Sequence, residues 1–224
     1  MTFYFILDVI QSLTMLTTMS ITMRNILAHD ILKSLNKLLI LIPLTGIIQL
    51  IFASFGALLL ENTTHKFIYT AITWIYIAVE MAVILKIFSH FIPNILKKTS
   101  IGFLAIIVFF TFLFRINEQI KSSLFSLASI CESVFLICIC LSVYLKLIFD
   151  NKVLNLLQEP IFFFNTGVFI LFSTTLPIYS LGFILEDNMN EYFPEYSFIN
   201  TISYVAFYYF VNKYIIIWKL IHRQ

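Results

Sequence analysis

The sequence has few charged residues. Asp, Glu, Lys and Arg together make up 12% of its 224 residues, and 60% of the chain is hydrophobic. A soluble domain carries roughly 25% charged residues, so half that share in so apolar a chain favours a membrane protein. The net charge of +2 is interpreted as the sum of a basic and an acidic membrane face, and it gives no indication of nucleic-acid binding.

The residue patterns of common enzymes are also missing from the sequence. It contains no Gly-rich phosphate loop and no serine in a nucleophile elbow. Its four histidines lack the spacing of a metal site, and the His, Asp and Ser pattern of a ceramidase-type hydrolase is absent. We therefore predict no metal centre and no cofactor, and a membrane enzyme remains only a minor alternative.

Cysteine is scarce, with three residues in the chain. All three fall in one apolar stretch: they are Cys131, Cys138 and Cys140. Cysteine inside a membrane helix usually packs as a small apolar side chain, so we expect free thiols and no disulfide.

Long apolar stretches dominate what is present. A membrane-spanning helix needs about 20 residues, and seven such stretches fill nearly the whole chain. The seven predicted spans are residues 2–23, 38–60, 67–90, 101–115, 124–149, 161–185 and 198–220. The first is interpreted as a span and not a signal peptide, because it lacks a basic start and is interrupted by Asp8. The fold class is therefore all-α, with residues 1–224 forming a single seven-helix transmembrane domain.

The basic residues alternate between the gaps. One set of gaps and helix ends holds most of them: Arg24, Lys33, Lys37, Lys86, Lys97, Lys98, Lys146, Lys152, Lys219 and Arg223. The opposite set holds Lys66, Arg115 and Lys121. Because cytoplasmic loops retain Lys and Arg, this asymmetry predicts an N-terminus outside and a cytoplasmic C-terminus. The predicted location is the inner (plasma) membrane, in which the chain is multi-pass.

Two carboxylic acids lie within predicted spans. Glu80 falls near the middle of the third span, and Glu132 lies slightly nearer the outer side in the fifth. Ionisable groups at membrane depth are costly and often mark functional sites. In one interpretation both acids face a shared cavity that binds a cation, a proton or an amine. In the other, both are protonated and hydrogen-bond across helices without further function.

Three other polar residues are candidates for the same site. Asn165 lies just inside the cytoplasmic end of the sixth span, and Asp8 and Lys213 are secondary candidates. Lys213 in the last span is expected to reach the cytoplasmic interface. A lysine there also resembles the retinal-binding lysine of microbial rhodopsins, but the third-helix arginine and Trp-lined box of that family are not recognisable here. Gly167 suggests a close approach of two helices.

Several short motifs resemble an uncharacterised family of short seven-helix membrane proteins of Bacteroidota-type bacteria. They are residues 79–81, 132–136, 159–167 and 218–219. The most specific part is the Glu-Pro-aromatic-Asn-Thr-Gly string of residues 159–167. The chain differs from the family in having Phe164 where a tryptophan is usual nearby, and in Lys213. The resemblance implies the seven-helix fold and a sensory or accessory role in signalling.

These observations favour a receptor-like or accessory signalling protein of the membrane. It would bind a small ligand or lipid near Glu80 and Glu132 and act on a cytoplasmic signalling protein or membrane complex through its basic inner face. The alternatives are a small proton- or cation-coupled transporter and a structural subunit of a larger membrane complex. Pro43 and Pro177 in the second and sixth spans are compatible with a transporter, although the internal repeat common in carriers is missing.

Overall fold

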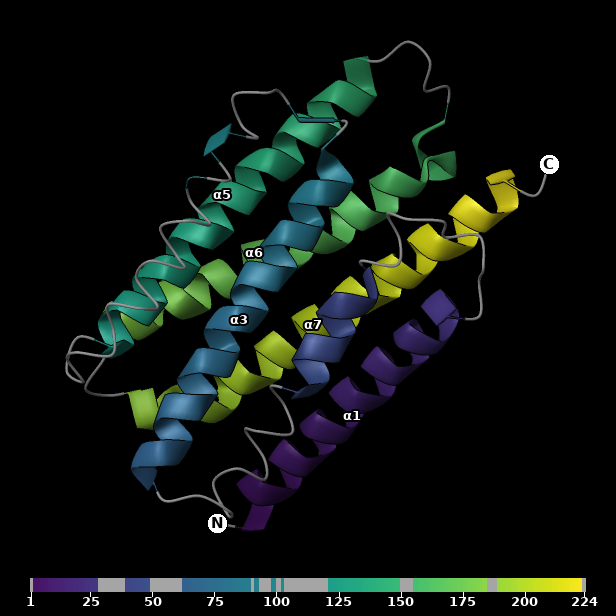
Figure 1. Ribbon diagram of the computed structural model, residues 1–224. Coiled ribbons are helices and arrows are strands. Elements are labelled where there is room, and N and C mark those ends of the chain that lie inside the picture. The colour runs from purple at the N-terminus through teal and green to yellow at the C-terminus, as the bar shows by residue number, and fades with distance from the viewer. Residues whose placement is uncertain are drawn as a thin grey trace. The chain divides into compact units, whose positions relative to one another are not determined.

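The computed structural model shows an all-helical protein (Figure 1). It describes residues 2–27, 39–48, 62–89, 91–92, 98–99, 102, 121–149, 155–184 and 189–222. Its main helices are α1 (Thr2–Leu27), α3 (Asn62–Phe88), α5 (Lys121–Phe149), α6 (Pro160–Ile184) and α7 (Met189–His222). A single 3₁₀ turn, η2 (Leu156–Gln158), precedes α6. No strand occurs within these described ranges, which agrees with the predicted all-α class.

The helices match the predicted spans in position, and α1, α3, α5 and α7 extend several residues beyond them at one end or both. α7 begins at Met189, within the segment predicted as an outer loop, and α3 begins at Asn62, within a predicted outer turn. Both parts of the prediction were wrong. Hydropathy marks the part of a helix that suits lipid, whereas backbone hydrogen bonding can continue through polar residues. Most of the second and nearly all of the fourth predicted span lie outside the described residues, so the count of seven remains a prediction.

The chain divides into two compact units. Unit 1 comprises residues 1–18 and 119–224, and unit 2 comprises residues 19–118. In unit 1, α6 packs against both α5 and α7 (Figure 1). Unit 2 holds α3, whose buried face includes Tyr76, Glu80, Met81 and Ile84.

The start of α6 is fixed by local sequence. Asn155 caps η2 by accepting a hydrogen bond from the Leu157 amide at 3.0 Å, and Pro160 then occupies the first position of α6. Proline suits that position because its missing N–H would have no helical partner there. α6 thus begins directly after η2, and it packs against α5.

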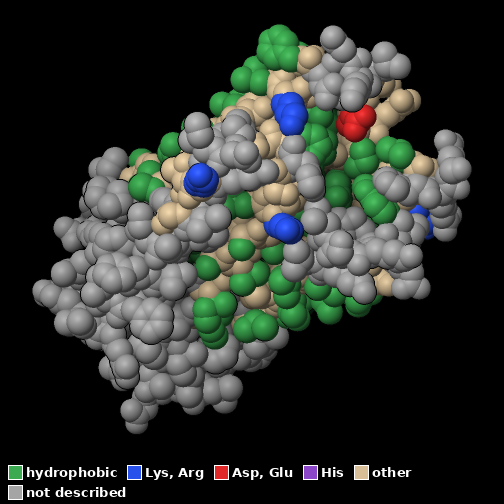
Figure 2. Space-filling view, turned by 45° about the horizontal axis from the view of Figure 1, so that its top comes forward, with side chains coloured by type: hydrophobic (Ala, Val, Ile, Leu, Met, Phe, Trp, Pro, Cys, Tyr) green, Lys and Arg blue, Asp and Glu red, His purple; other side chains and the backbone are tan. Residues whose placement is uncertain are grey.

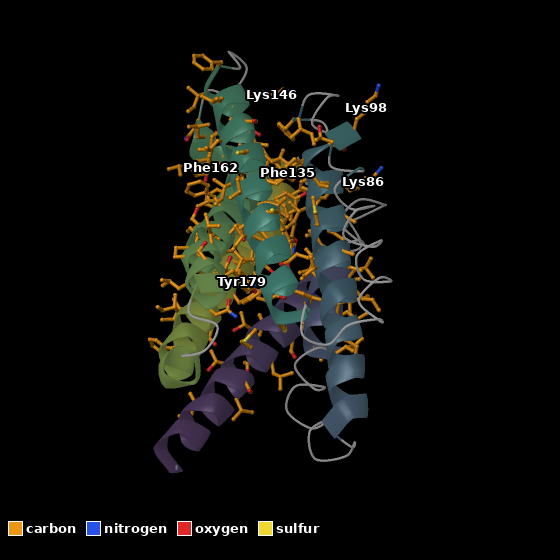
Figure 3. All side chains as sticks on the ribbon, turned by 90° about the vertical axis from the view of Figure 1, so that its left-hand side faces the viewer. Lys86, Lys98, Phe135, Lys146, Phe162 and Tyr179 are labelled. Carbon is orange, nitrogen blue, oxygen red and sulfur yellow. The ribbon has the colours of Figure 1, made fainter. Side chains whose placement is uncertain are left out.

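Contacts within unit 1 show that α6 runs antiparallel to both α5 and α7. Tyr144 of α5 contacts Phe162 near the start of α6, with ring centroids 5.9 Å apart. Lys146 and Phe162 lie toward one end of this pair and Tyr179 toward the other (Figure 3). Phe164 near the start of α6 packs on Tyr214 in the second half of α7, at 5.6 Å.

Two helices are long and apolar enough to cross a membrane. They are the segments Ser129–Phe149 of α5 and Pro160–Leu181 of α6. Only 39% and 44% of these stretches are buried, so each keeps much of its apolar surface exposed. Hydrophobic side chains cover much of the visible surface of the described residues (Figure 2). The core helix of a soluble protein would instead bury such side chains.

Candidate functional site

One face of α5 carries the acid Glu132. The buried residues Ser129, Glu132, Ser133 and Leu136 recur at the three- and four-residue spacing of one helical face. Glu132 is 4% exposed and its neighbour Ser129 is 2% exposed. This face is therefore polar toward the N-terminal half of α5. It is apolar further along the helix, where Leu136 and Ile139 are fully buried.

The register of α5 against α6 follows from one hydrogen bond between the two helices. The Asn165 side-chain amide donates to the Cys140 carbonyl at 3.1 Å. The two helices are antiparallel, so a step back along α5 corresponds to a step forward along α6. Glu132 lies eight positions before Cys140, and Ser173 lies eight positions after Asn165. Glu132 thus lies level with the run Ser173, Thr174 and Thr175 of α6, to within about one turn.

Helix α7 adds hydroxyl groups at a similar height. The Thr174 hydroxyl donates to the Ser203 hydroxyl of α7 at 2.6 Å, and Thr201 lies two residues earlier on α7, with its hydroxyl 4.0 Å from the Met15 sulfur. These polar side chains lie at a similar height on three helices, of which α6 packs against both α5 and α7; we call them the hydroxyl layer. Its members are Ser129, Glu132, Ser133, Thr174, Thr175, Thr201 and Ser203.

The hydroxyl protons of this layer are largely committed to backbone carbonyls. Ser133 donates to the Ser129 carbonyl at 2.7 Å, Thr175 to the Leu171 carbonyl at 2.9 Å and Ser203 to the Ile199 carbonyl at 2.8 Å. A hydroxyl has one proton and two lone pairs, so these oxygens retain only acceptor capacity. These three hydroxyls are therefore satisfied as donors within their own helices.

Asn165 forms a second, separate polar group. It is fully buried and bonds the Cys140 carbonyl. Beside it, the Tyr144 hydroxyl donates to the Thr166 hydroxyl at 2.8 Å. The eight residues of α5 between Cys140 and Glu132 span about 12 Å. The structure thus does not bring Asn165 next to Glu132, and the Asn165 group links α5 to α6 near the start of α6.

Glu80 is buried in unit 2. Its side chain is 2% exposed, and Tyr76, one turn earlier on α3, interacts with its carboxyl. Its Oε1 has no hydrogen-bond partner among the described residues. Glu80 and Glu132 belong to different units, so the cavity predicted to be shared by these two acids stays a prediction.

The two secondary candidates are Asp8 in α1 and Lys213 in α7. The side chain of Asp8 lies outside the described residues. Lys213 is half-buried, and its ammonium lies 5.7 Å from the centroid of the Tyr209 ring. Tyr209 is one turn nearer the start of α7, and the predicted reach of Lys213 to the cytoplasmic interface stays a prediction. The cation–π attraction between the ammonium group and the ring stabilises this position of the Lys213 side chain.

Sequence reasoning missed part of the hydroxyl layer. The sequence did not single out Ser129, Thr174, Thr175, Thr201 or Ser203. One signal was present: Ser129, Glu132 and Ser133 share one helical face by spacing alone. The α7 hydroxyls carried no such signal, because only the register between helices places them level with Glu132.

No protein-family model, no curated protein and no solved structure matches this chain.

The bond between Tyr144 and Thr166 gives a first testable prediction. Replacing Tyr144 by phenylalanine and Thr166 by valine, singly and together, should give a coupling energy of about 0.6 kcal/mol, the average for hydrogen bonds between membrane helices. The measurement is a double-mutant cycle on unfolding in detergent. Ser142→Ala is the control, since the Ser142 hydroxyl bonds only within α5, to the Cys138 carbonyl. A coupling near zero would contradict the link.

Proposed function

We propose that this chain is a multi-pass protein of the inner (plasma) membrane, with seven spans, an N-terminus outside and a cytoplasmic C-terminus. The exposed apolar residues of α5 support contact with lipid. They form a stripe along the helix that includes Val134, Leu141, Leu145 and Ile148, between 46% and 61% exposed. The resemblance of residues 159–167 to the short seven-helix family favours the same fold.

The helix ends support the proposed orientation. A basic residue lies in the last turn of α1 (Arg24), of α3 (Lys86) and of α5 (Lys146). These helices correspond to the odd-numbered spans, which run from outside to inside in the proposed topology. α6, an even-numbered span, has no basic residue in its last turn. This alternation is the pattern that retention of Lys and Arg on the cytoplasmic side produces.

Within this frame we propose a receptor-like or accessory signalling role. The observation that carries it is Glu132 in the hydroxyl layer, a buried polar group inside helices with apolar outer surfaces. Ser203 lies five residues after Phe198, the start of the seventh predicted span, or roughly 8 Å below the outer surface. A site in the outer half of the bilayer suits a ligand that arrives from outside.

A cytoplasmic partner completes the proposal. Lys86 and Lys146 are exposed at helix ends that are cytoplasmic in the proposed topology, where they would attract an acidic protein surface or anionic lipid. Ligand binding near Glu132 would be passed along α5, α6 and α7 to this basic inner face. Glu80, which is buried in unit 2, is proposed to be a ligand- or ion-binding acid in its own unit.

The membrane placement and orientation predict a simple fractionation result. The chain should stay with the membrane during alkaline carbonate extraction, because its exposed apolar stripes would otherwise meet water. A fluorescent reporter fused after Gln224 should be shielded from protease added outside intact cells. Release into the soluble fraction would contradict the membrane placement, and cleavage of the reporter would contradict the orientation.

The signalling role is tested by gentle purification from membranes and mass spectrometry of what accompanies the protein. A stoichiometric soluble-domain protein that is lost on charge reversal of Lys86 and Lys146 would support the proposal. A large stable membrane assembly retained by those variants would favour a structural subunit instead. Recovery of the chain without any protein would count against both.

A small proton- or cation-coupled transporter is the second candidate. The observation that favours it is Pro177 inside α6, two residues after Thr175 of the hydroxyl layer. Proline removes a helical hydrogen bond and permits bending, which would let the layer open alternately to the two sides. Flux into proteoliposomes that is lost in Glu132→Gln would favour this function over the receptor.

A further inference from the structure

We infer that the exposed face of α7 binds one anionic phospholipid, whose phosphate pairs with the Lys213 ammonium while its acyl chains lie along apolar side chains of the same face. This inference rests on the proposed function for the membrane setting and for the leaflet, which is the cytoplasmic one in the proposed topology. It goes further by giving Lys213 a ligand of stated chemistry.

The first argument is the face of α7 on which Lys213 lies. An exposed apolar stripe runs along this helix and consists of Phe198, Ile202, Tyr209, Ile216 and Leu220. Lys213 lies four positions after Tyr209 and three before Ile216, so it belongs to the same stripe. Phe207 and Tyr214, whose rings contact α6, lie on the opposite side of the helix. Lys213 is therefore on the side of α7 that is turned away from α6.

The second argument is that no carboxylate among the described residues pairs with the Lys213 ammonium. Its neighbour is the Tyr209 ring, with the centroid 5.7 Å away. The nearest acid along α7, Glu195, lies 18 positions before Lys213, or roughly 27 Å of helix. An ammonium group has three N–H donors, and an aromatic ring offers them no oxygen. A half-buried cation among apolar side chains is stabilised by an anion that comes to it.

The third argument is the size of the side chains around Lys213. Contacts between membrane helices are enriched in small residues, which let two backbones approach closely. Every exposed residue in the range 198–221 is instead a large hydrophobic one, and the small Thr201 and Ser203 are buried. Such a surface suits acyl chains better than a second helix. The single charge within it then favours a lipid with an anionic headgroup.

The fourth argument is the depth of Lys213. Trp218 lies five positions later, roughly 8 Å along the helix, and tryptophan rings favour the level of the lipid headgroups. The long lysine side chain can span such a depth and place its ammonium near a phosphate. The resulting charge-assisted hydrogen bond is a strong one. The acyl chains of the same lipid would then extend along Tyr209 and Ile202 toward the middle of the bilayer.

The experiment measures lipid binding to the detergent-purified full chain by native mass spectrometry. The probes are phosphatidylglycerol and phosphatidylcholine with the same acyl chains. One phosphatidylglycerol per chain should bind about tenfold more tightly than phosphatidylcholine. Glycerol phosphate, which has the charge without acyl chains, should not displace it. Equal binding of the two lipids would overturn the inference, and so would displacement by glycerol phosphate.

Variants of two lysines locate the effect. Lys213→Gln should weaken phosphatidylglycerol binding about tenfold, whereas Lys213→Arg keeps the charge and should retain most of the affinity. Lys146→Gln is the matched control, because it removes one positive charge from the exposed end of α5 and should change the affinity about twofold or less. Equal losses in Lys213→Gln and Lys146→Gln would show a general attraction to basic residues and overturn the inference. If Lys213→Gln does not fold, Lys213→Met, which suits contact with acyl chains, replaces it.

The result separates this inference from the proposed function. If the two lipids bind equally while the chain resists alkaline extraction and retains a soluble partner, only the lipid site fails. If phosphatidylglycerol binds through Lys213 but the reporter is cleaved, the lipid site stands and the proposed orientation is wrong. If Lys213→Gln loses a co-purified membrane protein and no lipid, an acidic partner helix pairs with Lys213 and the inference is wrong.

Discussion

Replacement of Phe164 by alanine is expected to lower the free energy of unfolding by about 3–5 kcal/mol. Phe164 is fully buried, and its ring contacts Phe207 and Tyr214 of α7 with centroids 6.3 and 5.6 Å away. Removal of the ring leaves a cavity between α6 and α7 that neither rigid helix can fill by itself. The measurement is Tm and denaturant unfolding in detergent, together with the amount of protein that accumulates in membranes.

Phe149→Ala is the matched control for this prediction. Phe149 ends α5 and is 77% exposed, so its loss should change stability by about 0.5 kcal/mol or less. Equal effects of the two substitutions would show that aromatic content, and not packing between α6 and α7, determines stability. Phe164→Leu should recover much of the loss, since it restores most of the buried volume.

Hydropathy was enough to predict the position of the apolar helices. The apolar runs placed α5 and α6 to within a few residues of their bounds, because in these helices lipid-compatible sequence and helix coincide. The prediction failed at the start of α7, where nine residues from Met189 to Ser197 are helical although they are polar enough for an outer loop. Charge and hydropathy indicate the environment of a segment, and helical hydrogen bonding does not depend on that environment.

The candidate site was predictable only residue by residue. Depth along a single span was enough to single out Glu132 and Asn165, because a buried polar group in an apolar run needs a partner. The sequence could not show that they lie about 12 Å apart along α5, nor that Ser203 lies level with Glu132. Those relations depend on how far each helix is shifted along its neighbour, which contacts such as Asn165 with Cys140 determine.

Gly167 is the residue that sets the separation of α6 and α7, as its place in the sequence suggested. A Cβ at this position would lie 2.8 Å from the Phe210 Cβ and 3.2 Å from the Phe207 carbonyl oxygen. The first distance is shorter than real contacts allow, and the second involves backbone that cannot rotate away. Gly167→Ala should therefore destabilise the protein by about 1–3 kcal/mol, and Gly167→Leu by more, because the helices must move apart.

The sign of the stability change distinguishes Gly167 from a glycine in an unobstructed helix. In an unobstructed helix, glycine to alanine stabilises by up to about 1 kcal/mol. Gly102 is helical and a Cβ there would meet nothing within 4 Å, so Gly102→Ala should be neutral or stabilising while Gly167→Ala lowers Tm. Separation of α6 from α7 would also part the Thr174 and Ser203 hydroxyls, which lie 2.6 Å apart. If Gly167→Ala changes stability no more than Gly102→Ala does, the close packing of α6 on α7 is wrong.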